Sequence, residues 1–197
     1  IGAGLPISEA TGSMIVDIGG GTTEIAVMSL GGVVFSKSLR IAGDAMDGAI
    51  INYMRKKFNL LIGESTAEKI KKEIGTAIPS TNNVFLMKGR DIRTGTPKEI
   101  SLTEEDACEA LMPILSQMLS AIKEALESTP PELSADLVDM GLVLTGGGAL
   151  LKNIDKLISK DTGLPVTIAD NPLECVAIGT GKALENEELF STMMSEY

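Results

Sequence analysis

The 197-residue sequence contains no histidine, no tryptophan and only two cysteines. The absence of histidine excludes catalysis by an imidazole and zinc sites with histidine ligands. Cys108 and Cys175 match no metal-ligand spacing, which is typical of a protein from a reducing compartment. Aromatic residues make up 3% of the chain, so aliphatic side chains must fill the core and little is available for stacking on bases.

Positive charge and long apolar runs are scarce as well. The sequence has 17 Lys and Arg against 27 Asp and Glu, a formal net charge of −10. Because nucleic-acid binding depends on basic side chains that displace counterions from phosphates, we expect no DNA or RNA partner. No apolar run approaches the roughly 18 residues of a membrane span, and no signal segment opens the chain, so we expect a cytoplasmic protein.

Glycine, in contrast, occurs in clusters. The stretch MIVDIGGGTTEIAVMSL, residues 14–30, places Gly19, Gly20 and Gly21 between two apolar runs. The residues after the glycines fit a strand better than a helix, so we expect the glycines at the tip of a β-hairpin, with a third strand in VVFSKSLRIA. A P-loop or a dinucleotide fingerprint requires a helix at this point, and neither motif fits. Bare N–H groups at a hairpin tip can form an anion-binding nest that phosphate oxygens approach closely.

Polar residues flank this first glycine cluster. Asp17, at the end of a buried strand, is a hard oxygen ligand suited to Mg²⁺, directly or through water. Thr22 and Thr23 can donate hydroxyl hydrogen bonds to a phosphate. A flexible loop would explain the three glycines alone equally well, but the whole pattern D-x-G-G-G-T-T between strands favours a phosphate site.

A second glycine cluster, Gly146, Gly147 and Gly148, follows an apolar strand in the stretch GLVLTGGGALLKNIDKLI. A helix is expected directly after it, and a helix N-terminus with free N–H groups is a place where a nucleotide can bind. Many α/β connections use glycine, so this cluster indicates a nucleotide site only when it is taken together with the first one. The apolar residues expected at helical spacing are Leu150, Leu151, Ile154, Leu157 and Ile158.

The middle of the sequence is predicted to contain two helices. Residues 44–58 have the apolar spacing of an amphipathic helix, with Asp44 as a candidate N-cap. Ser65 and Glu68 have the spacing of a capping box that opens a second helix over residues 66–75.

Further elements are expected toward the end of the chain. VFLMKG and KEISLT are typical of short strands, and a polar loop separates them. Residues 103–128 have the pattern of a long helix, which Pro113 should kink or split in two. Asn171 and Pro172 have the pattern of an N-cap and a first helical residue.

At this point the sequence resembles a known family. VDIGGGTTEIAV resembles the second phosphate loop of the actin, Hsp70 and sugar-kinase ATPase superfamily, and VLTGGGALL resembles its adenosine motif. Within the superfamily the chain is most similar to the MreB family of rod-shape-determining bacterial actins, with the weakest similarity over residues 80–97 and after residue 185. The segments that carry the resemblance are IGAGLP, GSMIVDIGGGTTEIAV, RIAGDAMDGAIINYMR, IGESTAEKIKKEIG, PPELSADL, GLVLTGGGALLKNID and NPLECVAIGTGKALE.

The resemblance implies an α/β fold, namely the second half of an actin-like ATPase of the ribonuclease H-like type. Subdomain IIA, a mixed sheet flanked by helices, would comprise residues 1–43 and 101–185. A smaller α+β subdomain, IIB, would be inserted over residues 44–100, and residues 186–197 would form an acidic C-terminal tail. The chain opens on IGAGLP without an initiator Met, so we expect it to be a piece of a longer protein.

The resemblance also implies roles for individual residues in binding ATP and Mg²⁺. Asp17 would hold Mg²⁺, the loop of Gly19, Gly20, Gly21 and Thr22 would grip the phosphates, and Thr22 would take part in hydrolysis. From spacing alone, Glu68 with Lys71 or Lys72 is a surface ion pair on a helix, but the family places these three residues at the ribose and adenine. Gly146, Gly147 and Gly148 would approach the adenosine and the α-phosphate.

The function implied is that of an ATP-binding cytoskeletal protein. It would polymerise with itself into filaments at the inner face of the cytoplasmic membrane and direct cell-wall elongation and rod shape. RodZ and the membrane proteins of wall elongation are the implied partners. Members of the family carry another phosphate loop and a catalytic glutamate upstream of the residues matching Ile1, so we expect this chain alone to hydrolyse ATP poorly or not at all.

Two other functional classes stay open. A soluble ATPase of the same superfamily, such as an Hsp70 chaperone domain or the division protein FtsA, shares the glycine motifs. An Hsp70 would continue into an apolar linker and FtsA into a basic membrane helix, whereas this chain finishes in the acidic ENEELFSTMMSEY. A nucleotide-free interaction module is the third class, and the presence of Asp17, Thr22 and Thr23 argues against it.

Overall fold

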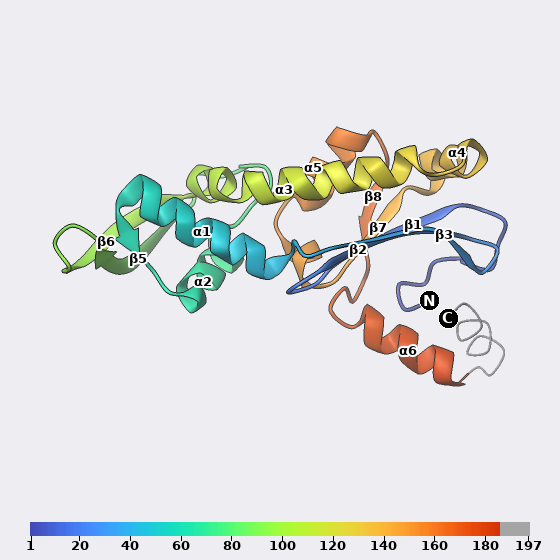
Figure 1. Cartoon of the computed structure of the whole chain (residues 1–197), viewed down its shortest axis with the longest axis horizontal. Helices are drawn as coiled ribbons and strands as arrows, with labels where there is room; N and C mark the ends of the chain where they lie inside the picture. The colour runs from blue at the N-terminus through green and yellow to red at the C-terminus, as the bar shows by residue number, and fades with distance from the viewer. Residues whose placement is uncertain (186–197) are drawn as a thin grey trace.

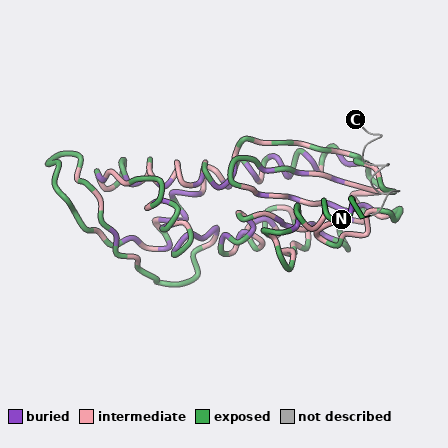
Figure 2. Tube along the Cα trace, turned by 90° about the horizontal axis from the view of Figure 1, so that it is seen from below, coloured by how far each residue is buried: buried purple, intermediate pink, exposed green. Residues whose placement is uncertain are grey.

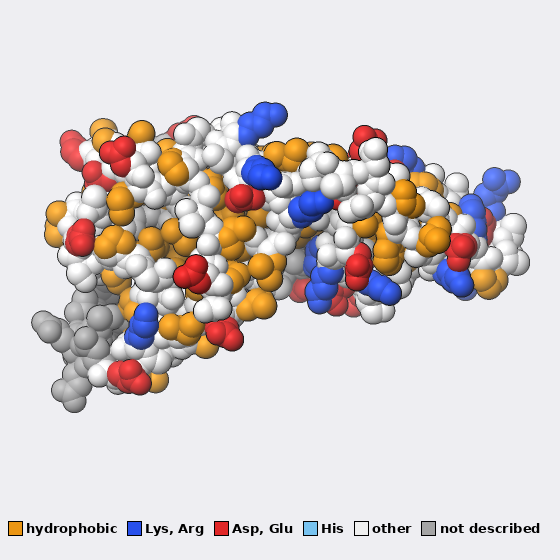
Figure 3. Space-filling view, turned by 180° about the vertical axis from the view of Figure 1, so that it is seen from behind, with side chains coloured by type: hydrophobic (Ala, Val, Ile, Leu, Met, Phe, Trp, Pro, Cys, Tyr) orange, Lys and Arg blue, Asp and Glu red, His pale blue; other side chains and the backbone are white. Residues whose placement is uncertain are grey.

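A computed structural model describes residues 1–185, so the predicted acidic tail over residues 186–197 lies outside the described residues. The chain forms an elongated molecule whose wider part contains a five-stranded sheet and whose narrower part contains a three-stranded sheet (Figure 1). Buried stretches run through both parts (Figure 2). Charged side chains crowd the narrower part on the face shown in Figure 3. The predicted limits of the two subdomains stay a prediction.

The five-stranded sheet begins with the β-meander expected from the sequence. Strands β1 (Ser13–Ile18), β2 (Thr23–Ser29) and β3 (Gly32–Leu39) pair in antiparallel order, with Asp17 opposite Glu24. Inward-facing apolar side chains alternate with more exposed ones along β2, as expected for a strand with one buried face. The first glycine cluster therefore lies at the tip of the β1–β2 hairpin, as predicted.

The three-stranded sheet is antiparallel throughout. It contains β4 (Leu60–Leu61), β5 (Val84–Asp91) and β6 (Pro97–Thr103) in the order β4-β5-β6. The strands predicted at VFLMKG and KEISLT are thus confirmed, and they form the hairpin β5–β6.

Two helices connect the two parts, and a third packs on both of them. α1 (Gly43–Phe58) follows the meander and packs on both α2 (Glu64–Ile74) and α3 (Glu104–Glu127). α3 runs along the molecule and contacts β2 and β3 of one sheet as well as β6 of the other (Figure 1). Among the helices of residues 1–185, none combines the length and apolar character needed to cross a bilayer.

The remaining elements complete the wider part. β7 (Leu142–Thr145) pairs in parallel with β1, and β8 (Val166–Ile168) pairs in parallel with β7. The sheet order is therefore β3-β2-β1-β7-β8. Helices α3, α4 (Pro131–Met140) and α5 (Ile154–Thr162) lie on one side of this sheet, and α6 (Cys175–Glu185) lies on the other (Figure 1). The predicted mixed sheet flanked by helices is confirmed.

The capping box predicted at Ser65 and Glu68 is wrong. α2 already begins at Glu64, and its N-cap position is Gly63, where no side chain makes a capping hydrogen bond. The Glu68 carboxylate instead pairs with Lys72 one turn further along the helix. An i,i+4 ion pair competes for the same carboxylate that a capping box requires.

A capping box is present at the start of α3. The Thr103 hydroxyl accepts a hydrogen bond from the Asp106 N–H at 3.2 Å, and the Asp106 carboxylate accepts one from the Thr103 N–H at 3.0 Å. The predicted split of this helix in two is wrong, because α3 continues through Pro113, while the alternative of a kink there stays a prediction. Pro113 is exposed, while Leu111 and Leu115 on either side of it are buried. Packing of the apolar stripe offsets the missing hydrogen bond at the proline.

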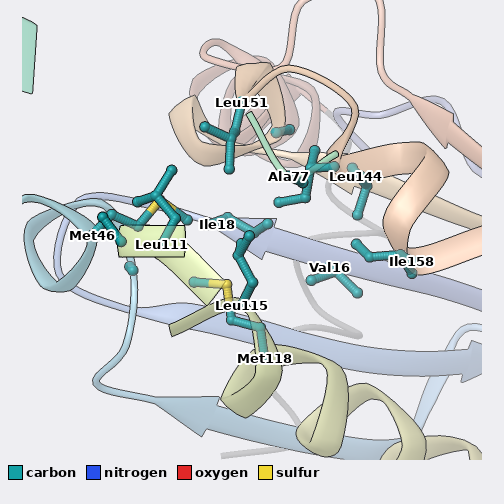
Figure 4. Packing of buried hydrophobic residues seen from close by; sticks show 14 of the residues in the cluster. Val16, Ile18, Met46, Ala77, Leu111, Leu115, Met118, Leu144, Leu151 and Ile158 are labelled. Carbon is teal, nitrogen blue, oxygen red and sulfur yellow. The ribbon is translucent and has the colours of Figure 1, made fainter. Parts of the chain in front are cut away.

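A single apolar core joins the elements of the wider and the narrower part. Val16 and Ile18 of β1 lie beside Leu115 and Met118 of α3, and Leu111 continues the stripe toward α1 (Figure 4). Full burial of each such side chain contributes about 1.5–3 kcal/mol. The core therefore fixes α3 and β1 relative to each other.

The capping box at the start of α3 predicts a measurable loss of stability when it is removed. Thr103→Ala removes the hydroxyl that satisfies the Asp106 N–H, and we expect the free energy of unfolding to fall by about 1 kcal/mol in urea denaturation. Ser101→Ala, which removes an exposed hydroxyl from β6, is the matched control. An equal effect of the two substitutions would contradict the role of the cap.

Candidate functional site

A cavity of about 980 Å³ opens where the two glycine clusters meet α1 and α2. Most of the residues predicted for the nucleotide site line it. Gly21, Thr22 and Thr23, which the structure also describes, lie outside this lining. The predicted residues that line the cavity are Asp17, Gly19, Gly20, Glu68, Lys71, Lys72, Gly146, Gly147 and Gly148.

The tip of the β1–β2 hairpin is held by the first turn of α1. The Gly43 N–H donates to the Gly19 carbonyl at 3.1 Å, and the Asp44 N–H donates to the Gly20 carbonyl at 2.8 Å. The first N–H groups of a helix have no partner within the helix, and here the carbonyl groups of the tip satisfy two of them. The carbonyl groups of Gly19 and Gly20 are thereby oriented toward α1.

The N–H groups at the tip of the hairpin, in contrast, are not held by the first turn of α1. Within residues 1–185 the structure gives no hydrogen-bond partner for the N–H groups of Gly20, Gly21 and Thr22, and all three residues are exposed. Such N–H groups can bind an anion. Thr23 is buried and its hydroxyl donates to the Ile41 carbonyl at 2.6 Å, so a bond from this hydroxyl to a phosphate would require the present one to break.

The second glycine cluster packs against the end of β1, beside Asp17. Asp17 lies next to Thr145 in the parallel pairing of β1 and β7. Gly146 has φ of +80°, and a Cβ placed on it would lie 2.4 Å from the Ile18 carbonyl oxygen and 2.6 Å from Asp17 Oδ1. A Cβ on Gly148 would lie 2.2 Å from Ile18 Cγ2. Only glycine fits at both positions, and the carboxyl ends of parallel strands are common ligand sites.

The helix expected directly after the second glycine cluster begins later than predicted. A short 3₁₀ turn (Gly147–Leu150) follows the glycines, and α5 starts at Ile154, after Asn153 in the left-handed conformation with φ of +60°. The reason is tertiary, because Lys152 forms a β-bridge with Thr76. The N-terminus of a long helix therefore does not lie at the glycines.

Lysine side chains on α2 line the opposite wall. Lys71 Nζ donates to the Gly43 carbonyl at 2.9 Å and to Asp47 Oδ2 at 2.8 Å, which ties α2 to the start of α1. Lys72 and Glu68 form an exposed ion pair at 2.7 Å. Their hydrogen bond lowers the pKa of Glu68 and raises the pKa of Lys72. Spacing alone suggests a surface ion pair at this place, and the structure contains it. Both of its residues, Glu68 and Lys72, also line the cavity.

Sequence reasoning missed four acidic residues that line this cavity, namely Asp44, Asp47, Glu64 and Glu73, and it placed the start of one helix wrongly. Asp44 is not the N-cap of α1, because Ala42 occupies that position; Asp44 and Asp47 instead line the cavity. Their i,i+3 spacing at the start of a helix was the available signal. Pro172 does not begin a helix, since α6 starts at Cys175; its carbonyl accepts the Gly146 N–H at 2.8 Å.

The close packing at Gly146 predicts a specific loss of stability. Gly146→Ala and Gly163→Ala both place a side chain at positive φ, at a cost of about 1 kcal/mol. Only the alanine at Gly146 also collides with Ile18 and Asp17, since Gly163 has open space around it. We expect Gly146→Ala to lower the free energy of unfolding by about 2 kcal/mol more in urea denaturation. Equal losses would contradict the packing.

Comparison with known proteins gives consistent matches. The family described as MreB/Mbl protein matches residues 1–192. The cell shape-determining protein MreB of Escherichia coli is 56% identical over 186 residues, which cover 94% of this chain and 54% of that protein. The structure of MreB5 of Spiroplasma citri bound to AMPPNP aligns with a TM-score of 0.91 at 38% identity, over 100% of this chain and 59% of that one.

A more distant structure shows the same fold. The MamK double helical filament aligns with a TM-score of 0.74 at 22% identity, over 88% of this chain and 54% of that one. The actin-like fold predicted from the sequence is thus confirmed. The chain spans about half the length of the curated relatives it matches.

Proposed function

The chain belongs to the MreB/Mbl protein family, and from this premise we propose that it carries most of the nucleotide site of an ATP-binding bacterial actin homologue that determines cell shape. The observation that carries the proposal is the meeting of the two glycine clusters around Asp17 in one cavity. The AMPPNP bound to the Spiroplasma relative supports a nucleotide as the occupant. The activity and partners of the whole protein are part of the proposal.

We propose for the individual residues the roles that the family resemblance implies, and their positions around the cavity support these roles. The free N–H groups of Gly20, Gly21 and Thr22 would bind phosphate oxygens, since these three residues are exposed to solvent. Thr22 would also take part in hydrolysis, and Thr23 would hold the tip through Ile41. The adenosine and α-phosphate would lie against Gly146, Gly147 and Gly148, with Glu68, Lys71 and Lys72 at the ribose and adenine.

The residues present fit a Mg²⁺ ion that arrives with the nucleotide. Within residues 1–185, no three carboxylate or thiol groups gather into a preformed metal site, and Asp17 is the carboxylate at the end of β1. Mg²⁺ is commonly bound by one or two carboxylates together with phosphates and water. Bound there, the ion would neutralise charge that develops on the phosphates.

Hydrolysis in this proposal is attack of water on the γ-phosphate without a covalent intermediate. The contribution of this chain is to position the phosphates at the hairpin tip and to hold Asp17 beside them. The upstream phosphate loop and glutamate expected from the family resemblance would complete the site, so the chain alone would turn over ATP slowly. Hydrolysis would then time the stability of a polymer.

We further propose that the intact protein assembles with itself into filaments. The filament formed by MamK, which has the same fold, supports this proposal. The name of the Escherichia coli relative supports a role in cell shape. RodZ, the membrane proteins of wall elongation and the inner face of the cytoplasmic membrane are the partners and the place we propose for it.

The proposal predicts nucleotide-dependent assembly. We expect the full-length parent protein to sediment with Mg-ATP and to stay in the supernatant without it. Asp17→Ala should abolish sedimentation, because it removes the proposed Mg²⁺ ligand. Asp139→Ala, which changes an exposed carboxylate on α4 outside the cavity lining, is the matched control and should sediment like the wild type. A parent that hydrolyses ATP but stays soluble at every concentration would overturn the cytoskeletal function.

A further inference from the structure

A buried carboxylate outside the proposed chemistry lies at the start of α3. The Glu104 side chain is 1% exposed. It accepts hydrogen bonds from Lys152 Nζ at 2.6 Å, from the Thr81 hydroxyl at 2.6 Å and from the N–H groups of Ser80 and Thr81, both at 3.0 Å. A buried charge is stable only when it is paired and hydrogen-bonded, and this one is both.

Glu104 is charged at neutral pH. Burial raises the pKa of its carboxyl, but the hydrogen bonds from Lys152, Thr81 and Ser80 together outweigh burial and lower the pKa to about 2. Because this value lies below the ordinary one, the stabilising contribution of the carboxylate is present at neutral pH and is lost only in acid.

The partners of Glu104 belong to two segments that are far apart in the sequence. Ser80 and Thr81 lie in residues 76–83, the segment between α2 and β5, which we call the strap. Lys152 follows the second glycine cluster and lines the cavity. Its carbonyl accepts the N–H of Ala77 in the strap at 2.8 Å, while its ammonium group reaches Glu104. Lys152 is therefore held through its backbone and through its side chain.

These contacts connect the two walls of the cavity. The strap continues from Gly75, which ends α2 and lines the cavity, and α2 carries Glu68, Lys71 and Lys72. The second glycine cluster forms the facing wall. A nucleotide between the walls would contact both, so its affinity depends on their separation.

We propose that Glu104 is a positioning residue of the nucleotide site, which holds Lys152 and the strap together and thereby fixes the second glycine cluster relative to α2. This inference rests on the proposed function of the cavity. A buried ion pair adds little stability over an apolar replacement of the same volume, whereas its directional hydrogen bonds fix a geometry. The Glu104 carboxylate accepts five hydrogen bonds, one of them from the Asn83 amide at 3.5 Å. They come from two segments, the strap and Lys152, as a positioning role requires.

The test uses the full-length parent protein, with AMPPNP and Mg²⁺ as the probe in titration calorimetry. Glu104→Gln keeps the shape of the side chain but removes its charge, and Lys152→Met keeps the stem but removes the donor. We expect each to weaken AMPPNP binding by roughly tenfold. Lys152→Arg, which restores a cationic donor, should bind AMPPNP like the wild type.

Two controls separate positioning from a general loss of stability. Glu105→Gln changes the adjacent, exposed carboxylate on α3, and Lys123→Met breaks the ion pair of Lys123 with Asp161, which lies outside the cavity lining. Both should leave the affinity unchanged. Hydrogen exchange of the Ala77 N–H, measured without nucleotide, should be faster in Glu104→Gln and Lys152→Met than in either control.

The outcomes are distinct. If the wild type binds AMPPNP and both Glu104→Gln and Lys152→Met bind it within about twofold of the wild type, the positioning role is overturned while the proposed function stands. If the wild type does not bind AMPPNP, the proposed function fails and the positioning role fails with it. Should Glu104→Gln not fold, Lys152→Met decides the question, because the Lys152 side chain is 42% exposed.

Discussion

The parallel pairing of β1 with β7 is the constraint on which the site depends. It brings together segments more than 120 residues apart and places Asp17 beside Thr145, so that each strand delivers its glycine cluster to the same edge of the sheet. Neither cluster forms a cavity alone. The tight approach of Gly146 and Gly148 to Ile18 then fixes how far apart the two clusters lie. Parallel pairing requires a long crossover, and here the crossover contains the whole narrower part of the molecule.

α3 makes this crossover rigid. Its apolar stripe packs on both sheets, and its first residue, Glu104, anchors the strap and Lys152. One helix thus supports the core at one end and the wall of the cavity at the other. Its continuity through Pro113 follows from the same packing, because a break there would remove part of the apolar stripe from the core.

Features set by local pattern were predictable from the sequence. The β1–β2 hairpin, the β5–β6 hairpin and the amphipathic α1 follow from apolar periodicity and turn residues, and the two glycine clusters indicated the cavity. One error was local, because α2 begins at Glu64 and Ser65 therefore lies inside the helix, where it cannot cap it. The other errors arose where a distant segment decides the local structure. The start of α5 depends on the bridge of Lys152 with Thr76. The role of Asp44 depends on the carbonyl group of Gly20.

The hydrogen bonds between the hairpin tip and the first turn of α1 have a mechanical consequence. They join the glycine tip at one end of the cavity to a rod of 16 residues, which is about 24 Å long. A tilt of the tip by about 5° would move the far end of that rod, and the three-stranded sheet beside it, by about 2 Å. Because α1 also packs on α2 and α3, such a tilt would displace these helices as well, so the hairpin tip is mechanically coupled to the opposite end of the molecule.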